Sequence, residues 1–273
     1  MDEPSHYLSI CEQAVRSAGA TILDWVGKTS VRHKGPADLV TEADFAAQEV
    51  IRNIVLGEFP THQLLGEEGG DPPREQDASS ALGPRYRWIT DPLDGTTNFV
   101  HRVPHYSVSL ALERGGQVLV GAIFDPHLEE CFTAAAGRGA WLNGQPIRAS
   151  EVAQLSEGLA ATGFPASVWP GAPDLLVFNE AVFRCQGVRR TGSAALNLAY
   201  LAAGRFDVLW AFSTKIWDVA AGTLLVKEAG GVVTSPEGGE FILDTARYIA
   251  AATPPLHAQL LGMVRTALGG RQD

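Results

Sequence analysis

Apolar residues recur at helical spacing over residues 5–26 and predict an amphipathic helix. A second helix is predicted to begin after Thr41, which is a suitable N-cap ahead of Glu42 and Asp44. The polar segment 28–36 between the helices is expected to form a loop, and we hypothesise that it is mobile and closes over a site. The apolar positions of the first helix are Leu8, Cys11, Val15, Ala18, Ile22 and Val26.

Strand-like segments follow the second predicted helix. Leu64 and Leu65 end a short strand before a glycine-flanked pair of glutamates, and residues 106–112 and 118–124 flank a Gly-Gly turn as the strands of a hairpin do. Residues 130–136 predict another strand. The segment 71–84 is rich in Pro, Asp, Ser and Gly and is expected to be an exposed excursion.

The pattern changes near residue 150. Beyond that point helix-like and strand-like segments alternate, which favours a layered α/β fold. We therefore expect an N-terminal α+β half, residues 1–150, and a C-terminal α/β half, residues 151–273. The alternating segments are 159–163, 174–184, 187–190, 194–203, 206–210, 219–229 and 231–234.

Composition and charge narrow the class of protein. Of the 273 residues, 45% are hydrophobic and 19% charged, as in a folded enzyme. The formal net charge of −10 argues against a protein that binds nucleic acid through a basic face. Three widely spaced cysteines, with no signal-peptide pattern and no apolar run near the roughly 20 residues of a membrane helix, favour a cytoplasmic protein without membrane partners.

The run Asp-Pro-Leu-Asp-Gly-Thr-Thr at residues 91–97 is the most informative motif. It places two carboxylates and several backbone N–H groups on a turn at the end of a predicted strand. Carboxylates suit a hard divalent cation, and a helix N-terminus suits a phosphate. An ordinary surface turn is the alternative, because the same residue types are common turn formers.

Four further residues could extend this turn into a site. Glu67 follows a predicted strand, Asp44 and Asp218 lie at helix starts, and Lys34 lies in the segment before the second helix. An isolated acid at a helix start is usually only a cap or a partner of the helix dipole. Asp44 and Asp218 therefore become functional candidates only in combination with the turn at residues 91–97.

Four motifs in order and in register resemble the inositol monophosphatase family of Mg²⁺-dependent, lithium-sensitive phosphomonoesterases. They are Asp-Leu-Val-Thr-Glu-Ala-Asp (38–44), Gly-Glu-Glu-Gly (66–69), Asp-Pro-Leu-Asp-Gly-Thr-Thr-Asn-Phe (91–99) and Trp-Asp-Val-Ala-Ala-Gly (217–222). The resemblance implies an αβαβα sandwich of the type shared with fructose-1,6-bisphosphatase. It also implies a homodimer and a small phosphorylated metabolite as substrate.

The resemblance further implies a metal site with two or three Mg²⁺ ions. Glu67, Asp91 and the carbonyl group of Leu93 would hold the first ion, and Asp91, Asp94 and Asp218 the second. Glu67 would share a looser third ion through water. Two ions roughly 4 Å apart can clamp the attacking and leaving oxygens of a phosphoryl transfer.

Catalytic and substrate-binding roles follow from the same resemblance. Thr96, linked to Asp44, and Glu67 would orient and activate the attacking water, and no covalent nucleophile on the protein would be needed. The backbone of Gly95 and Thr96 would bind the phosphate. The residues expected to contact the substrate are Asp94, Gly95, Thr96, Gly192, Ser193, Ala194 and Asp218.

The identity of the alcohol is left open by Ala211. Inositol-specific members of the family have a glutamate seven residues before the helix-start aspartate, and Ala211 stands at that position. An alanine side chain cannot accept hydrogen bonds from a polyol. Inositol 1-phosphate, histidinol phosphate and a sugar phosphate such as fructose 1,6-bisphosphate remain alternatives, as does a non-catalytic regulatory or scaffold protein on the same fold.

Overall fold

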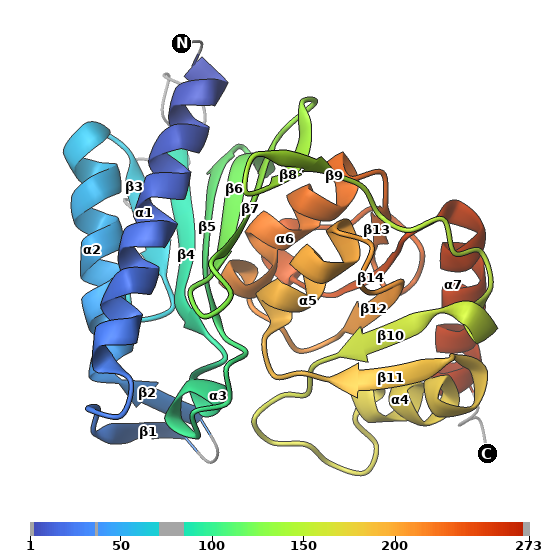
Figure 1. Cartoon of the computed structure of the whole chain (residues 1–273). Helices are drawn as coiled ribbons and strands as arrows, with labels where there is room; N and C mark the ends of the chain where they lie inside the picture. The colour runs from blue at the N-terminus through green and yellow to red at the C-terminus, as the bar shows by residue number, and fades with distance from the viewer. Residues whose placement is uncertain (1–2, 36–37, 71–84, 270–273) are drawn as a thin grey trace.

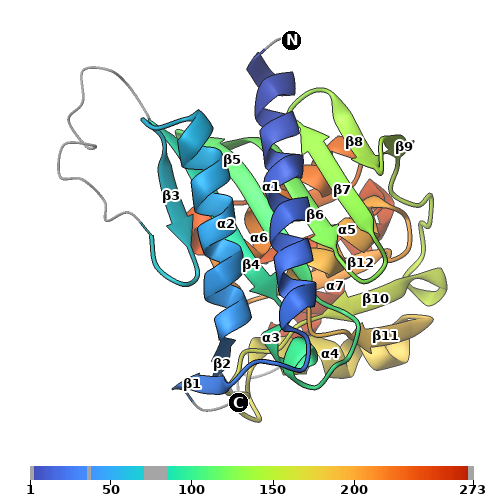
Figure 2. The ribbon, with the colours of Figure 1, turned by 60° about the vertical axis from the view of Figure 1, so that its left-hand side comes forward.

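The computed structural model describes residues 3–35, 38–70 and 85–269, and it stacks helices and sheets in five alternating layers (Figure 1). The predicted αβαβα sandwich is therefore confirmed. The first layer holds two antiparallel helices that cover one face of a seven-stranded sheet (Figure 2). These helices are α1 (Glu3–Trp25) and α2 (Glu42–Glu58).

The amphipathic pattern of α1 is confirmed by burial. Cys11, Val15, Ala18 and Ile22 are fully buried against α2 and the sheet, whereas Val26 lies beyond the helix and is exposed. Complete burial of a branched aliphatic side chain contributes roughly 1.5–3 kcal/mol. This stripe therefore fixes α1 on the sheet.

The seven-stranded sheet forms the second layer. Its first two strands, β3 and β4, are parallel, and every later neighbour is antiparallel. The predicted hairpin is confirmed as β5 and β6. In spatial order the strands are β3 (Gln63–Gly66), β4 (Tyr86–Asp94), β5 (Ser107–Arg114), β6 (Gln117–Asp125), β7 (Glu130–Ala135), β8 (Gly139–Leu142) and β9 (Gln145–Ile147).

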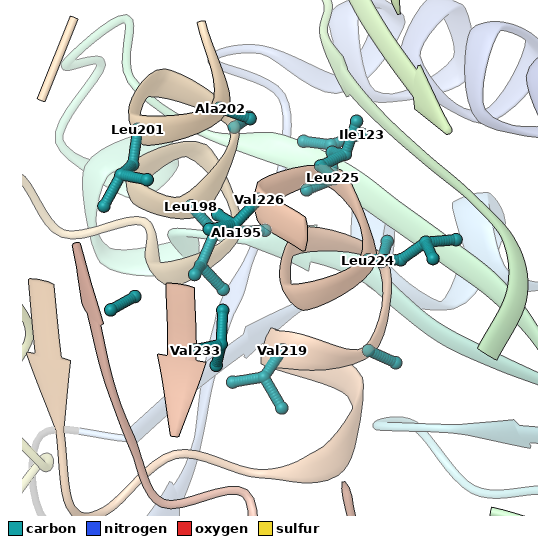
Figure 3. Close-up of a cluster of buried hydrophobic side chains, with 14 of the residues drawn as sticks. Ile123, Ala195, Leu198, Leu201, Ala202, Val219, Leu224, Leu225, Val226 and Val233 are labelled. Atoms are coloured by element: carbon teal, nitrogen blue, oxygen red, sulfur yellow. The ribbon is translucent and has the colours of Figure 1, made fainter. Parts of the chain in front are cut away.

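Helices α5 (Ala194–Ala202) and α6 (Ile216–Glu228) form the middle layer and pack closely between the two sheets (Figure 3). A Cβ atom added at Gly222 of α6 would lie 2.5 Å from the Cβ of Leu198 on α5. One added at Gly121 of β6 would lie 2.9 Å from the Cα of Ala221. Glycine at these contacts lets α6 approach α5 on one side and strand β6 of the N-terminal half on the other.

The fourth layer is a five-stranded sheet, and its outer face is covered by α4 and α7. Strands β11, β10 and β12 are parallel, and β14 is antiparallel to both of its neighbours. In spatial order the strands are β11 (Gly187–Arg190), β10 (Leu159–Thr162), β12 (Val208–Ala211), β14 (Tyr248–Ala251) and β13 (Val232–Thr234), and the covering helices are α4 (Pro173–Arg184) and α7 (Pro254–Gly269).

The prediction of a loop at residues 28–36 is wrong for most of that segment. Residues Val31–Gly35 form strand β1, which pairs antiparallel with β2 (Asp38–Thr41). A polar segment becomes a strand here because backbone pairing with a neighbour overrides its weak local preference. Mobility of this segment stays a prediction. The predicted excursion at 71–84 lies outside the described residues, as does Pro36.

The segment 148–158 joins the two sheets and contains the predicted boundary at residue 150, together with a short 3₁₀ turn. The division into an N-terminal and a C-terminal half stays a prediction, because α5 and α6 pack against both sheets and connect the two halves in one core. Cys11, Cys131 and Cys185 carry free thiols. None of the described helices combines the length and the apolar character that crossing a membrane requires.

Candidate active site

A cavity of about 840 Å³ lies where β4, the short helix α3 (Thr96–Val100) and the start of α6 meet the strand ends of the five-stranded sheet. The walls include every residue predicted to bind metal or substrate, whereas Asp44 does not line them and the side chain of Lys34 lies outside the described part of the chain. Asp44 lies behind the cavity lining and contacts it through the hydroxyl of Thr96. The predicted residues that line the cavity are Glu67, Asp91, Leu93, Asp94, Gly95, Thr96, Gly192, Ser193, Ala194 and Asp218.

A β-bulge brings Asp91 and Asp94 to the same wall. Asp91 pairs with Ser109 of β5 and Asp94 with Ser107, so three steps on β4 match two steps on β5. In a regular strand, residues three apart face opposite sides, and one extra residue reverses that parity. Pro92 lies in the bulge, where its missing N–H is tolerated.

Thr96 is joined to Asp44, as the resemblance implies. Its hydroxyl lies 3.2 Å from Oδ1 of Asp44 and 3.0 Å from the carbonyl oxygen of Leu93. Asp44 is buried in the first turn of α2, and its Oδ2 accepts hydrogen bonds from the N–H (2.8 Å) and hydroxyl (2.7 Å) of Thr41. The capping box of α2 therefore fixes the carboxylate that faces Thr96.

Asp94 is bound by the N-terminus of α5, which belongs to the other half of the chain. The backbone N–H groups of Ala194 (3.1 Å) and Ala195 (2.8 Å) and the hydroxyl of Ser193 donate to its carboxylate. Ser193 also caps α5 by accepting from the N–H of Leu196 at 3.2 Å. Ser193 and Ala194, expected at the substrate, thus bind Asp94 in this structure.

Burial leaves the negative charge of this wall poorly compensated. It raises the pKa of Asp94 to about 6, although three hydrogen bonds oppose the shift. Burial and the nearby Asp94 raise the pKa of Asp218 to about 8, and burial with Glu67 raises that of Asp91 well above its usual range. Carboxylic acids in this state take up either protons or cations.

The donors at this wall fit a hard cation, although they are not yet gathered around one point. They are carboxylate oxygens and one backbone carbonyl, which are the ligands that Mg²⁺ prefers. Within residues 3–35, 38–70 and 85–269, no three His, Cys, Asp or Glu side chains already stand at metal-binding spacing.

The other wall of the cavity follows from the parallel strands of the five-stranded sheet. Thr162 of β10 is in register with Arg190 of β11, and Ala211 at the end of β12 is in register with Tyr248 at the start of β14. The carboxyl ends of the parallel strands β10, β11 and β12 therefore lie on the same side of the sheet, and open α/β sheets bind ligands at the carboxyl ends of their strands. Ala211 lies in this wall at 4% exposure and presents no hydrogen-bonding side chain.

Sequence reasoning missed several side chains of the cavity lining, among them Asp174, Arg190 and Arg247. Asp174 is buried, and its Oδ1 accepts the N–H of Phe212 at 3.0 Å. Burial raises the pKa of Asp174, and the neighbouring Arg247 acts in the opposite direction. Asp174 looks like an ordinary helix-start acid in the sequence, and nothing near Arg247 signals a site.

Comparisons with known proteins agree over almost the whole chain. Residues 3–268 match the inositol monophosphatase family. The chain is 41% identical over 259 residues to the Nus factor SuhB of Pseudomonas aeruginosa, covering 93% of this chain and 94% of that protein. It is also 41% identical over 249 residues to the inositol-1-monophosphatase of Rhizobium meliloti, covering 90% and 91%.

Two solved structures extend the comparison to the fold. The extragenic suppressor protein suhB of Bartonella henselae is 37% identical, has a TM-score of 0.87 and shares 95% of this chain and 98% of its own. The inositol monophosphatase of Anabaena is 35% identical, has a TM-score of 0.82 and shares 96% of each chain. The layers described above are those of these proteins.

Proposed function

Because the chain belongs to the inositol monophosphatase family, we propose that it hydrolyses a small phosphomonoester with the help of Mg²⁺. The observation that supports this most directly is the convergence of Glu67, Asp91, Asp94 and Asp218 on one wall of a single cavity. These four acids come from two strand ends and a helix start that are far apart in the sequence. A surface turn would require no such convergence.

The proposed ligand assignment uses all four acids. Glu67, Asp91 and the carbonyl oxygen of Leu93 would hold one ion, and Asp91, Asp94 and Asp218 would hold a second. Glu67 would also reach a third ion through water. Bound Mg²⁺ supplies positive charge to the phosphate and lowers the pKa of a water molecule.

The chain's own groups would position the reactants. The backbone N–H groups of Gly95 and Thr96, at the start of α3, would hold the phosphate oxygens. While the Thr96 hydroxyl donates its hydrogen to Asp44 or to the Leu93 carbonyl, its oxygen stays free to accept from the attacking water. Glu67 would take the second hydrogen of that water, so orientation and proton acceptance are divided between two side chains.

We propose that the alcohol part of the substrate lies against the strand ends of the five-stranded sheet. Ala211 offers it an apolar surface, and Arg190 and Arg247 line the same wall. Inositol 1-phosphate, a sugar phosphate and histidinol phosphate are the candidate substrates. Inhibition by Li⁺, a homodimer and a cytoplasmic location complete the proposal by analogy with the family.

A second candidate function is supported by the names of the relatives. The Pseudomonas aeruginosa protein called Nus factor SuhB and the Rhizobium meliloti inositol-1-monophosphatase are equally similar to this chain, at 41% identity. We therefore propose a Nus-factor role as the alternative to catalysis. This role would be one specific case of the non-catalytic regulatory or scaffold protein considered above. It would require a macromolecular partner in place of the expected small phosphorylated metabolite.

The deciding experiment is release of inorganic phosphate from a panel of phosphomonoesters with and without Mg²⁺. The panel holds p-nitrophenyl phosphate, inositol 1-phosphate, fructose 1,6-bisphosphate, histidinol phosphate and a nucleoside monophosphate. We expect Mg²⁺-dependent release from at least one of them and loss of release in excess EDTA. If all five stay intact at every Mg²⁺ concentration, the phosphatase proposal fails and the Nus-factor role becomes the better account.

A further inference from the structure

Asn98 joins the two halves of the cavity with a single carboxamide group. It lies in α3, two residues after Thr96, and its side chain is partly buried. Its Nδ2 donates to the carbonyl oxygen of His105 at 2.7 Å and to that of Thr191 at 2.9 Å. The first carbonyl precedes β5 in the N-terminal half, and the second follows β11 in the C-terminal half. Both protons of the amide are therefore used, one on each half.

The turn at residues 191–193 packs directly against the side chain of Asn98. Gly192 has a φ of +98°, which favours glycine, and a Cβ added there would lie 2.7 Å from Nδ2 of Asn98. Only a residue without a side chain allows this approach. The position of the turn at residues 191–193 is therefore set by contact with Asn98 as well as by hydrogen bonding.

The same turn delivers the donors that orient Asp94. Ser193, Ala194 and Ala195 follow Gly192 directly, and their hydroxyl and N–H groups bind both carboxylate oxygens. Asp94 itself comes from β4, in the opposite half. A shift of the turn relative to α3 would therefore move three donors at once and rotate the Asp94 carboxylate.

We propose that Asn98 is a positioning residue that holds the turn 191–193 against α3 and thereby sets the orientation of Asp94 for Mg²⁺. The inference rests on the proposed Mg²⁺-dependent function. Asn98 touches neither metal ligand nor substrate in this assignment and acts only through the turn and Asp94. Groups that orient a metal ligand from behind typically change metal affinity or activity by about 10–100-fold when they are replaced.

The test replaces the donor while keeping the shape of the side chain. Asn98→Asp has almost the same volume but presents oxygens to the two carbonyl groups, and Asn98→Ala removes the amide without adding charge. We expect Asn98→Asp to raise the Mg²⁺ concentration needed for half-maximal binding, measured by calorimetry and by the Mg²⁺-induced rise in Tm, about 10-fold or more. We expect kcat to fall by a similar factor, while KM changes less than the Mg²⁺ affinity, because the backbone N–H groups of Gly95 and Thr96 that would hold the phosphate are not replaced.

Gln259→Glu is the matched control. Nε2 of Gln259 donates to the carbonyl oxygen of Ala153, also at 2.7 Å, across a long sequence separation and away from the cavity. This control removes an equivalent bond between α7 and the segment 148–158. We expect it to lower Tm and to leave Mg²⁺ binding and kcat unchanged.

The outcomes separate the inference from the proposed function. Equal shifts in Mg²⁺ binding for Asn98→Asp and Gln259→Glu would overturn the positioning role, as would unshifted binding in a folded Asn98→Asp protein. If Asn98→Asp does not fold, Asn98→Ala carries the same expectation with a smaller shift, and an unshifted Asn98→Ala overturns the inference. A wild-type protein that neither binds Mg²⁺ nor releases phosphate would overturn the proposed function and this inference together.

Discussion

The two walls of the cavity differ in the charges of their side chains. The carboxylate wall, which consists of Glu67, Asp91, Asp94 and Asp218, gathers acids. Burial and mutual proximity raise the pKa of Asp91, Asp94 and Asp218. The strand-end wall, which consists of Asp174, Arg190, Ala211 and Arg247, mixes both signs of charge with an apolar surface.

The difference indicates a division of labour. Asp91, Asp94 and Asp218 are buried acids whose raised pKa values mean that ionising them costs stability in the free protein, so their accumulation at one wall is understandable if cations bind there. At the strand-end wall, the positive charge of Arg247 already opposes the rise in the pKa of Asp174, whose carboxylate also accepts hydrogen bonds from Phe212 and Ser213. We infer that the carboxylate wall carries the chemistry and that the strand-end wall selects the alcohol.

The largest expected effect comes from neutralising one acid of the carboxylate wall. Asp218→Asn keeps the shape of the side chain but removes a charged ligand, and several kcal/mol of transition-state stabilisation correspond to a loss of about 10²–10³ in kcat. In EDTA at pH 8.5, above the pKa of about 8 of Asp218, the same variant should have an unchanged or higher Tm, because one of several repelling charges is gone. Phosphate release and thermal unfolding measure the two effects.

Asp207→Asn is the control for that experiment. Asp207 is also buried and also accepts a backbone N–H, from Leu159 at 2.7 Å, but it lies outside the cavity lining. We expect it to lower Tm and to leave kcat within about threefold of the wild type, since it contacts no proposed ligand. An Asp218→Asn protein that keeps near-normal kcat would remove the basis for treating the two walls differently.

An intermediate effect is expected on the pH dependence of stability. The folded-state pKa values of Asp94 (about 6) and Asp218 (about 8) are raised above the usual value near 4, so the folded protein holds more protons than the unfolded chain between those limits. Stability without Mg²⁺ should therefore be greatest at low pH within this window and fall by several kcal/mol as pH rises to about 8, because each unit of pKa shift corresponds to about 1.4 kcal/mol.

Saturating Mg²⁺ should reverse this trend, because the ion binds the deprotonated acids and stabilises the folded state increasingly as pH rises. Thermal unfolding from pH 5 to 8.5, in EDTA and in Mg²⁺, measures both curves. Two parallel curves would show that the acids of the carboxylate wall do not take up the cation.

The smallest effect is expected at the strand-end wall. Asp174→Asn keeps an oxygen that can accept the N–H of Phe212, but the carboxylate that faces the cavity is lost. We expect KM for a hydroxyl-rich substrate to rise up to about tenfold, which is the size of one lost hydrogen bond to a charged group. KM for p-nitrophenyl phosphate and the affinity for Mg²⁺ should stay the same.

Glu180→Gln on the same helix serves as the control, because Glu180 lies on the exposed side of α4 in an ion pair with Arg184. It should change neither KM. Equal changes for both substrates in Asp174→Asn would contradict a selective role for the strand-end wall.

The fold was predictable wherever local pattern and final environment agreed. The amphipathic stripe of α1 and the hairpin of β5 and β6 are examples, since each buries one continuous face. The prediction failed at 31–35, where backbone pairing makes a strand of a polar segment. No element was predicted for residues 248–269, which form β14 and α7.

The sequence by itself determined the acids at 91 and 94, the helix-start acids at 44 and 218, and the resemblance that joins them with Glu67. These residue types and spacings follow from what a metal and a phosphate require. Only the tertiary structure decided that a bulge turns Asp91 and Asp94 to one side, that α5 binds Asp94, and that Asp174, Arg190 and Arg247 share their cavity. The reason is physical: spacing along a chain fixes local geometry, whereas contacts between residues about 100 positions apart depend on how the layers pack.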